Sequence, residues 1–203
     1  MKNDKETRQK LLVSAKKEFM EKGYVKASLR NICKNTGVTT GALYFFFKDK
    51  EDLFGSLIRE PLETLYQFMK EHYVSESNYV VEEKKEMRDF QEDRDMMEKI
   101  IRFMYQHREE FLLLIEKSQG SVYENFADRF IEVTQKHYRL MADRYSDYLH
   151  KPRVDDYSIH WISHMEIDVF IHMLTHEPLE EEALKHSAII IKFMIAGWLG
   201  LFQ

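Results

Sequence analysis

The chain of 203 residues is long enough to bury a hydrophobic core without the help of disulfides or metal ions. Its 7 Gly and 3 Pro are too few turn formers for an all-β sandwich or barrel, and its single cysteine excludes a disulfide framework. The net charge of −5 hides an asymmetry: residues 1–60 hold 13 Lys and Arg against 8 Asp and Glu, whereas residues 61–203 hold 17 against 27. The basic N-terminal segment is therefore where nucleic-acid contacts are expected.

The sequence predicts neither a signal peptide nor a membrane segment. The charged N-terminus has no apolar run behind it. The most apolar stretch, residues 188–202, contains Lys192 and falls short of the about 20 residues that a membrane span needs. Together with the single cysteine, which suits a reducing compartment, this favours a cytoplasmic, nucleoid-associated protein without a membrane partner.

Helical periodicity runs through almost the whole chain, and no internal repeat interrupts it. The pattern predicts a first helix that ends at Gly23 and a second helix capped by Ser28. Either Thr39 or Thr40 caps a short third helix that runs through Phe46. The sequence therefore predicts an all-α protein that begins with three helices.

A fourth helix is expected to start at Asp49, with Pro61 bending or splitting it. The polar residues 75–78 are expected to break the chain again. The predicted helices beyond the third cover about 49–73, 79–106, 108–118, 121–150, 155–176 and 180–201.

The second and third helices are joined by a tight turn, as in a helix-turn-helix motif. Gly37 supplies the positive φ that this turn needs without steric cost. The third helix opens with small residues, which allow its N-terminus to approach DNA closely. Lys48 follows that helix directly, so we expect it to reach backbone phosphates.

The segment from Ser28 to Leu53 resembles the DNA-binding domain of TetR-family transcriptional regulators, and the likeness extends from about Thr7 through Leu57. The residues that fall on the family pattern are Gly37, Val38, Gly41, Leu43, Tyr44, Phe47 and Lys50. Two residues depart from it, because Cys33 replaces a usual Ala and Phe46 replaces a His that often contacts phosphate. One backbone contact is therefore expected to be missing, since a Phe donates no hydrogen bond.

The resemblance implies a three-helix helix-turn-helix DNA-binding domain over residues 1–48 and a helical effector-binding and dimerisation domain over residues 49–203. It also implies that the third helix enters the major groove of a double-stranded operator. Tyr44 and Lys50 are expected to bond phosphates, and Arg30 a phosphate or a base. The predicted DNA-binding residues are Arg30, Thr39, Thr40, Gly41, Tyr44, Lys48 and Lys50.

Residues 61–203 are rich in aromatic side chains and Met, a composition that suits a cavity for a flat or lipophilic ligand. The resemblance implies an effector pocket in this part, although no motif marks its lining. The residues chosen as ligand-binding candidates are Tyr66, Phe103, Tyr105, Tyr123 and His164. The acidic balance favours a small, mostly apolar effector that is neutral or cationic, and no cofactor is predicted.

Four histidines, His160, His164, His172 and His176, follow one another along one predicted helix. The first and last lie about 24 Å apart along a helix axis, so one metal ion cannot bind all four. Neither pair carries the Glu of a zinc-protease helix. We therefore predict no metal site here and expect polar pocket lining or a face between subunits.

The last two predicted helices indicate a dimer. Residues 188–202 are apolar nearly all round, and Gly197 allows close approach of another helix. A homodimer that joins the last two helices of each subunit into a four-helix bundle covers such a surface. The resemblance implies the same interface.

These observations favour a ligand-responsive repressor that leaves a pseudo-palindromic operator when its effector binds. An effector-independent regulator or activator is the alternative, and the sequence does not separate the two. An enzyme is not expected, because the chain has no nucleophile–base arrangement and no phosphate-cradling glycine loop.

Overall fold

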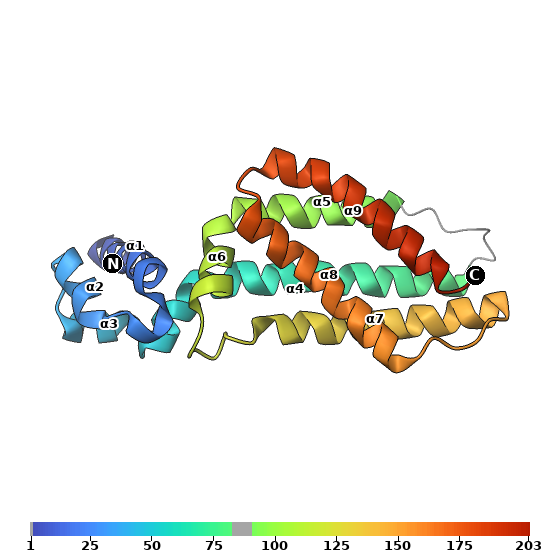
Figure 1. Cartoon of the computed structure of the whole chain (residues 1–203). Coiled ribbons are helices and arrows are strands. Elements are labelled where there is room, and N and C mark those ends of the chain that lie inside the picture. The colour runs from blue at the N-terminus through green and yellow to red at the C-terminus, as the bar shows by residue number, and fades with distance from the viewer. Residues whose placement is uncertain (1, 83–90) are drawn as a thin grey trace. The chain divides into compact units, whose positions relative to one another are not determined.

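The computed structural model describes the backbone of residues 2–82 and 91–203, and the side chains of residues 4–76 and 91–203. All regular structure in these residues is helical, which confirms the predicted all-α class (Figure 1). The helices are α1 (Lys2–Lys26), α2 (Leu29–Thr36), α3 (Thr40–Phe46), α4 (Lys50–Glu82), α5 (Gln91–Gln106), α6 (Arg108–Lys117), α7 (Phe126–Leu149), α8 (Asp156–His176) and α9 (Glu180–Gly200).

The chain folds into two compact units. The first unit comprises residues up to 64 and residues 107–126, and the second comprises residues 65–106 and 127–203. The first unit thus holds α1–α3, the beginning of α4 and α6. The second holds the rest of α4 together with α5, α7, α8 and α9.

Local capping sets the ends of the short helices in the first unit. Ser28 caps α2 by accepting a hydrogen bond from the Asn31 N–H (3.4 Å). Gly37 ends α2 in the left-handed region at φ 68°, as expected. The Thr39 hydroxyl accepts from the Ala42 N–H (3.2 Å), which decides between the two predicted caps of α3. These contacts confirm the predicted helix-turn-helix.

An apolar core holds α1, α2 and α3 together. Leu11, Phe19, Ile32 and Leu43 are fully buried, so α1, α2 and α3 each contribute to it. Phe19 also packs edge-on against Phe54 at the start of α4, with ring centroids 5.0 Å apart. This packing continues from the helix-turn-helix into α4 and makes one rigid core of the first unit.

The fourth helix is not interrupted at either of the two places where the sequence allowed a split. α4 passes through Pro61 without splitting and continues through residues 75–78, which the sequence predicted to be a break. The reason is tertiary: Glu76 is buried, and its Oε2 lies 2.6 Å from His137 Nε2 of α7. This buried contact on one face of α4 outweighs the weak helix propensity of the neighbouring serines. The predicted start of the next helix at residue 79 falls partly outside the described residues.

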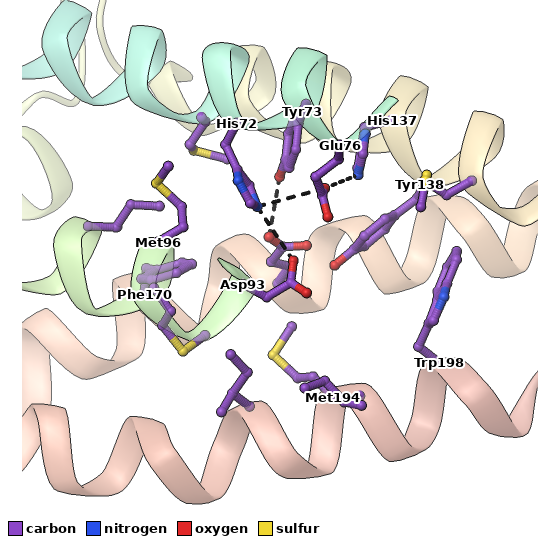
Figure 2. A pocket seen from close by; sticks show the side chains of 17 residues that line it. His72, Tyr73, Glu76, Asp93, Met96, His137, Tyr138, Phe170, Met194 and Trp198 are labelled. Carbon is purple, nitrogen blue, oxygen red and sulfur yellow. Dashed lines mark hydrogen bonds and ion pairs between the residues drawn. The ribbon is translucent and has the colours of Figure 1, made fainter. Parts of the chain in front are cut away.

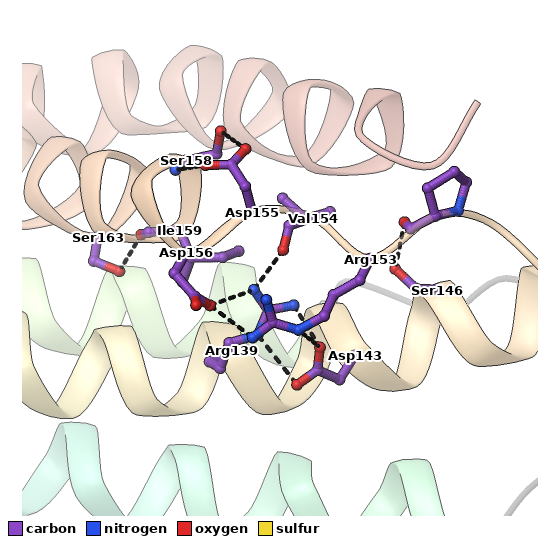
Figure 3. Close-up of polar contacts among 11 residues, drawn as sticks. Arg139, Asp143, Ser146, Arg153, Val154, Asp155, Asp156, Ser158, Ile159 and Ser163 are labelled. Carbon is purple, nitrogen blue, oxygen red and sulfur yellow. Dashed lines mark hydrogen bonds and ion pairs between the residues drawn. The ribbon is translucent and has the colours of Figure 1, made fainter.

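A polar network fixes the turn between α7 and α8 in the second unit (Figure 3). The Arg139 guanidinium binds both carboxylate oxygens of Asp143 (2.6 and 3.1 Å) and donates to the Val154 carbonyl (2.6 Å). Asp155 then caps α8 by accepting from the Ser158 N–H (2.9 Å). The start of α8 is therefore held by charge-assisted hydrogen bonds, which are about twice as strong as neutral ones.

Helix α9 is poorly covered within the chain. By length and composition it is long and apolar enough to cross a membrane, which corrects the expectation that no segment reaches that length. Only 17% of its most apolar window is buried, and Ile189 and Phe193 are largely exposed. A Cβ added at Gly197 would meet nothing within 4 Å. This face of α9 therefore remains open to a partner.

Candidate nucleic-acid interface and buried cavity

Helix α3 presents one continuous exposed face. Gly41, Tyr44, Phe45 and Lys48 are exposed and follow the i, i+3, i+4, i+7 spacing of a helix stripe, with Lys48 just beyond the helix end. Tyr44 is 52% exposed and Phe45 77% exposed. The opposite side of the helix carries Leu43, which is fully buried. Core packing thus leaves the exposed stripe available for an outside partner.

The predicted DNA-binding residues differ in their surroundings. Arg30 is exposed on α2, whereas the Thr39 hydroxyl is occupied by the cap of α3. Thr40 is half-buried, and its hydrogen bond to the Cys33 thiol lowers the pKa of that thiol, although burial raises this pKa by more. Thr39 and Thr40 therefore each make a contact inside the protein.

Lys50 also has partners within the first unit. Its Nζ donates to the Val25 carbonyl (3.1 Å) and lies 4.8 Å from the centre of the Tyr24 ring. Burial lowers the pKa of Lys50. The Tyr24 hydroxyl in turn donates to Glu51 (2.8 Å), and burial together with this carboxylate raises the pKa of Tyr24 to about 12. Lys50 thus ties the start of α4 to the end of α1, and its phosphate contact stays a prediction.

Phe45 is a candidate contact residue outside the set of DNA-binding residues predicted from the sequence. Its ring packs edge-on against Phe46 (5.0 Å between centroids), while Phe47 is buried beneath the Arg8 guanidinium (5.2 Å). The three consecutive phenylalanines therefore occupy three different environments. The spacing of four residues from Gly41 is the sequence feature that places Phe45 on the exposed stripe.

The second unit contains a partly open cavity of about 120 Å³ between its helices (Figure 2). Much of its lining is apolar or aromatic, as the composition led us to expect. These residues are Met69, Tyr73, Met96, Met97, Ile100, Tyr138, Met141, Phe170, Ile191, Met194, Ile195 and Trp198. Five ionisable residues share the same cavity: His72, Glu76, Asp93, His137 and Glu166. The sequence analysis identified none of these five, because they come from four different helices.

The ionisable residues lie in contact with one another. Glu76 Oε2 lies 2.6 Å from His137 Nε2 and 3.7 Å from His72 Nε2, and His72 Nε2 lies 3.5 Å from Asp93 Oδ1. The side chains of Glu76 and His137 are 3% and 4% exposed. The Tyr73 ring stacks on His137 with centroids 4.2 Å apart. This cluster is therefore a dense, largely buried arrangement of acids and imidazoles, with Asp93 at its more exposed edge.

Glu166 faces the cluster from α8. The Tyr73 hydroxyl donates to its Oε1 (3.3 Å). Burial raises the pKa of Glu166, although a hydrogen bond from Tyr138 and the nearby His137 oppose this effect. Burial likewise raises the pKa of Tyr73 and Tyr138 well above the ordinary value of a tyrosine. Both hydroxyls therefore act as neutral donors in the cavity.

Residues 11–57 match the family model of bacterial regulatory proteins, tetR family. Over 53 residues the chain is 45% identical to the HTH-type transcriptional repressor BepR of Brucella suis, and over 52 residues it is 48% identical to the regulator AcrR of Shigella flexneri. Each match covers 26% of this chain, and it spans about a quarter of the length of the relative (25% and 24%).

Solved structures extend the likeness over the whole fold. NalD of Pseudomonas aeruginosa, a secondary repressor of a multidrug efflux pump, superposes with a TM-score of 0.57 at 21% identity over 97% of this chain and 98% of its own. The TetR-family regulator PfmR of Thermus thermophilus gives 0.56 at 19% identity over 90% and 97%. The N-terminal segment is thus similar to TetR-family regulators, and the chain as a whole shares the fold of these two solved structures. Its homologues are named as transcriptional regulators, which agrees with the expectation of a non-enzymatic protein.

The five ligand candidates from the sequence lie outside this cavity. Tyr66 packs against Phe130, and Phe103 packs against Phe68. The remaining three are engaged elsewhere: the Tyr105 hydroxyl donates to the Glu177 carbonyl (2.7 Å), Arg59 donates to the Tyr123 hydroxyl (3.3 Å), and His164 packs against His160. A ligand role for these residues stays a prediction without a described pocket.

The four histidines of α8 form two separate pairs in the TetR-family fold. The rings of His160 and His164 are 4.5 Å apart, and those of His172 and His176 stack at 4.0 Å. The second pair borders an open hollow of about 520 Å³ between α8 and α9, which His186 and Ile190 also line. This hollow adjoins the uncovered part of α9.

Proposed function

We propose that this protein is a DNA-binding transcriptional repressor that acts as a homodimer in the cytoplasm and releases its operator in response to an effector. The observation that carries the proposal is the exposed stripe of α3 on a helix-turn-helix, within the segment that matches the TetR-family model. In helix-turn-helix proteins, the element that enters the major groove is a recognition helix whose outer face is exposed.

The contacts on DNA divide by chemistry. Tyr44 and Lys48 bond backbone phosphates and set the position of α3, which adds affinity without sequence preference. Gly41 has no side chain, and only open space surrounds the position of its missing Cβ. The backbone of the helix can therefore approach the groove closely at this position. Phe45 supplies an apolar surface for a thymine methyl group and contributes base preference. Arg30 on α2 adds a further phosphate or base contact.

The uncovered apolar face supports the dimer. Trp161 of α8 and Ile189 and Phe193 of α9 are exposed, and Gly197 leaves room for a second helix. A second copy of the chain buries these side chains by forming a four-helix bundle from α8 and α9. The dimer presents two recognition helices, so the operator has two related half-sites.

The cavity in the second unit supports effector control. It combines a mostly apolar wall with a few convergent polar groups, and its volume of about 120 Å³ limits the effector to a small group or an ion. An effector releases DNA only if it binds the DNA-free conformation more tightly than the DNA-bound one. By linkage, the operator must weaken effector binding by the same factor.

Footprinting of the purified full-length protein on DNA upstream of its own gene tests the proposal. We expect protection of a two-fold related site, and Lys48→Ala should lower affinity for all sequences and flatten the salt dependence by about one unit of slope. Lys117→Ala, on α6 outside the helix-turn-helix, is the matched control and should change neither quantity. Binding that shows no sequence preference would contradict a regulator of this kind.

A further inference from the structure

Three side chains at one side of the cavity are spaced as the ligands of a metal ion are. His72 and Glu76 lie one turn apart on α4, and Asp93 reaches the same point from α5 (Figure 2). One ligand atom from each of the three lies within 4.8 Å of the other two. A tetrahedral ion with bonds of about 2.1 Å holds its ligand atoms about 3.4 Å apart. The 3.7 Å and 3.5 Å separations from His72 Nε2 are close to that value.

A buried carboxylate in the lining of the same cavity also points to a cation. Glu166 Oε2 is buried and meets no hydrogen-bond donor within the described part of the chain. Buried carboxylates are costly unless a cation or donors compensate them.

The size of the cavity decides between an ion and a larger ligand. Sites for drug-sized molecules measure about 300–1,000 Å³. The cavity of about 120 Å³ is well below that range, and Met, Tyr and Trp side chains line much of it. It has room for an ion with a few waters without displacement of the helices.

We propose that His72, Glu76 and Asp93 bind a first-row divalent transition-metal ion in the second unit. The close contact between His137 Nε2 and Glu76 Oε2 (2.6 Å) makes His137 a positioning residue, because carboxylate ligands of metals are themselves held by such partners. The imidazole selects ions such as Zn²⁺, Mn²⁺ or Fe²⁺ over Mg²⁺ and Ca²⁺, which prefer all-oxygen sites. The role of the ion as effector rests on the proposed function, whereas its binding does not.

Titration of the chelator-treated full-length protein with Zn²⁺ and Mn²⁺, followed by calorimetry, tests the site. We expect one saturable site per chain at micromolar ion, with a rise in melting temperature, and much weaker binding of Mg²⁺ and Ca²⁺. His72→Gln and Asp93→Asn should each lower the affinity by more than about 100-fold, and His137→Gln by about 10–100-fold. Co²⁺ should give visible bands in the wild type that His72→Gln removes.

The double variant His172→Gln, His176→Gln is the matched control, because it removes a stacked histidine pair outside the cavity. This control should leave the affinity for the metal ion unchanged. The circular dichroism spectrum of every metal-free variant should match that of the wild type, which shows that the variant is folded. If His72→Gln does not fold, the isosteric Asp93→Asn and Glu76→Gln decide the question. Absence of saturable binding to the wild type, or binding that only the control variant removes, would overturn the inference.

The same samples separate this inference from the proposed function. Operator binding of the metal-free protein reports on the helix-turn-helix alone, so its loss would contradict the repressor proposal and leave the metal result intact. A quaternary ammonium compound that stabilises the protein while Zn²⁺ and Mn²⁺ do not would assign the cavity to an organic cation and overturn the metal site.

Discussion

The two units of the chain carry their functional groups in opposite ways. In the first unit the candidate contacts lie on the outside of a solid core, and all the exposed stripe residues come from within eight consecutive positions of one short helix and its end. In the second unit the functional groups lie inside, and they come from α4, α5, α7 and α8. Local sequence determines a surface of the first kind, whereas only the assembled fold creates a site of the second kind.

The largest expected effect tests whether the two units are independent. Phe19→Ala empties a fully buried position between α1 and α4 and should cost about 3–5 kcal/mol of unfolding free energy. We expect loss of operator binding in a protein that still binds a metal ion in its second unit. Denaturant unfolding and hydrogen exchange measure this, and simultaneous loss of both functions would show that the units fold as one.

The next effect concerns the uncovered face of the second unit. Phe193→Asp places a charge where the proposed dimer buries an aromatic ring that is 69% exposed in the single chain. It should weaken the dimer by about 2 kcal/mol or more, roughly 30-fold in dissociation constant. Sedimentation measures this, with Val74→Asp on α4 as the exposed apolar control. A wild-type monomer at micromolar concentration would disprove the interface.

A smaller effect separates base contacts from phosphate contacts on α3 of the first unit. Phe45→Ala should reduce discrimination at one base pair of each half-site, for which about 1–3 kcal/mol is typical, while its salt dependence stays as in the wild type. Tyr44→Phe should instead weaken binding to all sequences similarly, because it removes one phosphate bond. Selection of preferred sites from random DNA distinguishes the two variants. If Phe45→Ala selects the same base sequences as the wild type, Phe45 does not contribute to base recognition.

The smallest expected effect concerns the buried charge of the second unit. The folded-state pKa of Glu166 is raised above its ordinary 4.5 by burial. The metal-free wild type should therefore lose stability as pH rises through the window above 4.5, because the folded state holds the proton there and the unfolded state does not. Glu166→Gln should be more stable than wild type at neutral pH and equal to it below pH 4.5. Thermal melts of both proteins across this pH range test the prediction. Melting temperatures that change with pH in the same way for both proteins would contradict a raised pKa of Glu166.

The sequence by itself determined the helical class, the helix-turn-helix and its likeness to TetR-family regulators. Ser28, Gly37 and Thr39 act through hydrogen bonds and φ values within a few residues, so their roles follow from local order. The apolar run at the end of the chain likewise predicted an uncovered helix. Local capping and helical periodicity depend on neighbours along the chain, which is why they could be predicted without a structure.

Only the tertiary structure decided the rest. The sequence predicted a break at residues 75–78, but the buried contact between Glu76 and His137 keeps α4 helical there. Lys50 turned out to bond the Val25 carbonyl, and the aromatic residues chosen as ligand contacts lie away from the cavity. The cavity brings together residues 72, 93, 137 and 166, whose proximity depends on how four helices pack, and no local pattern in the chain encodes that packing.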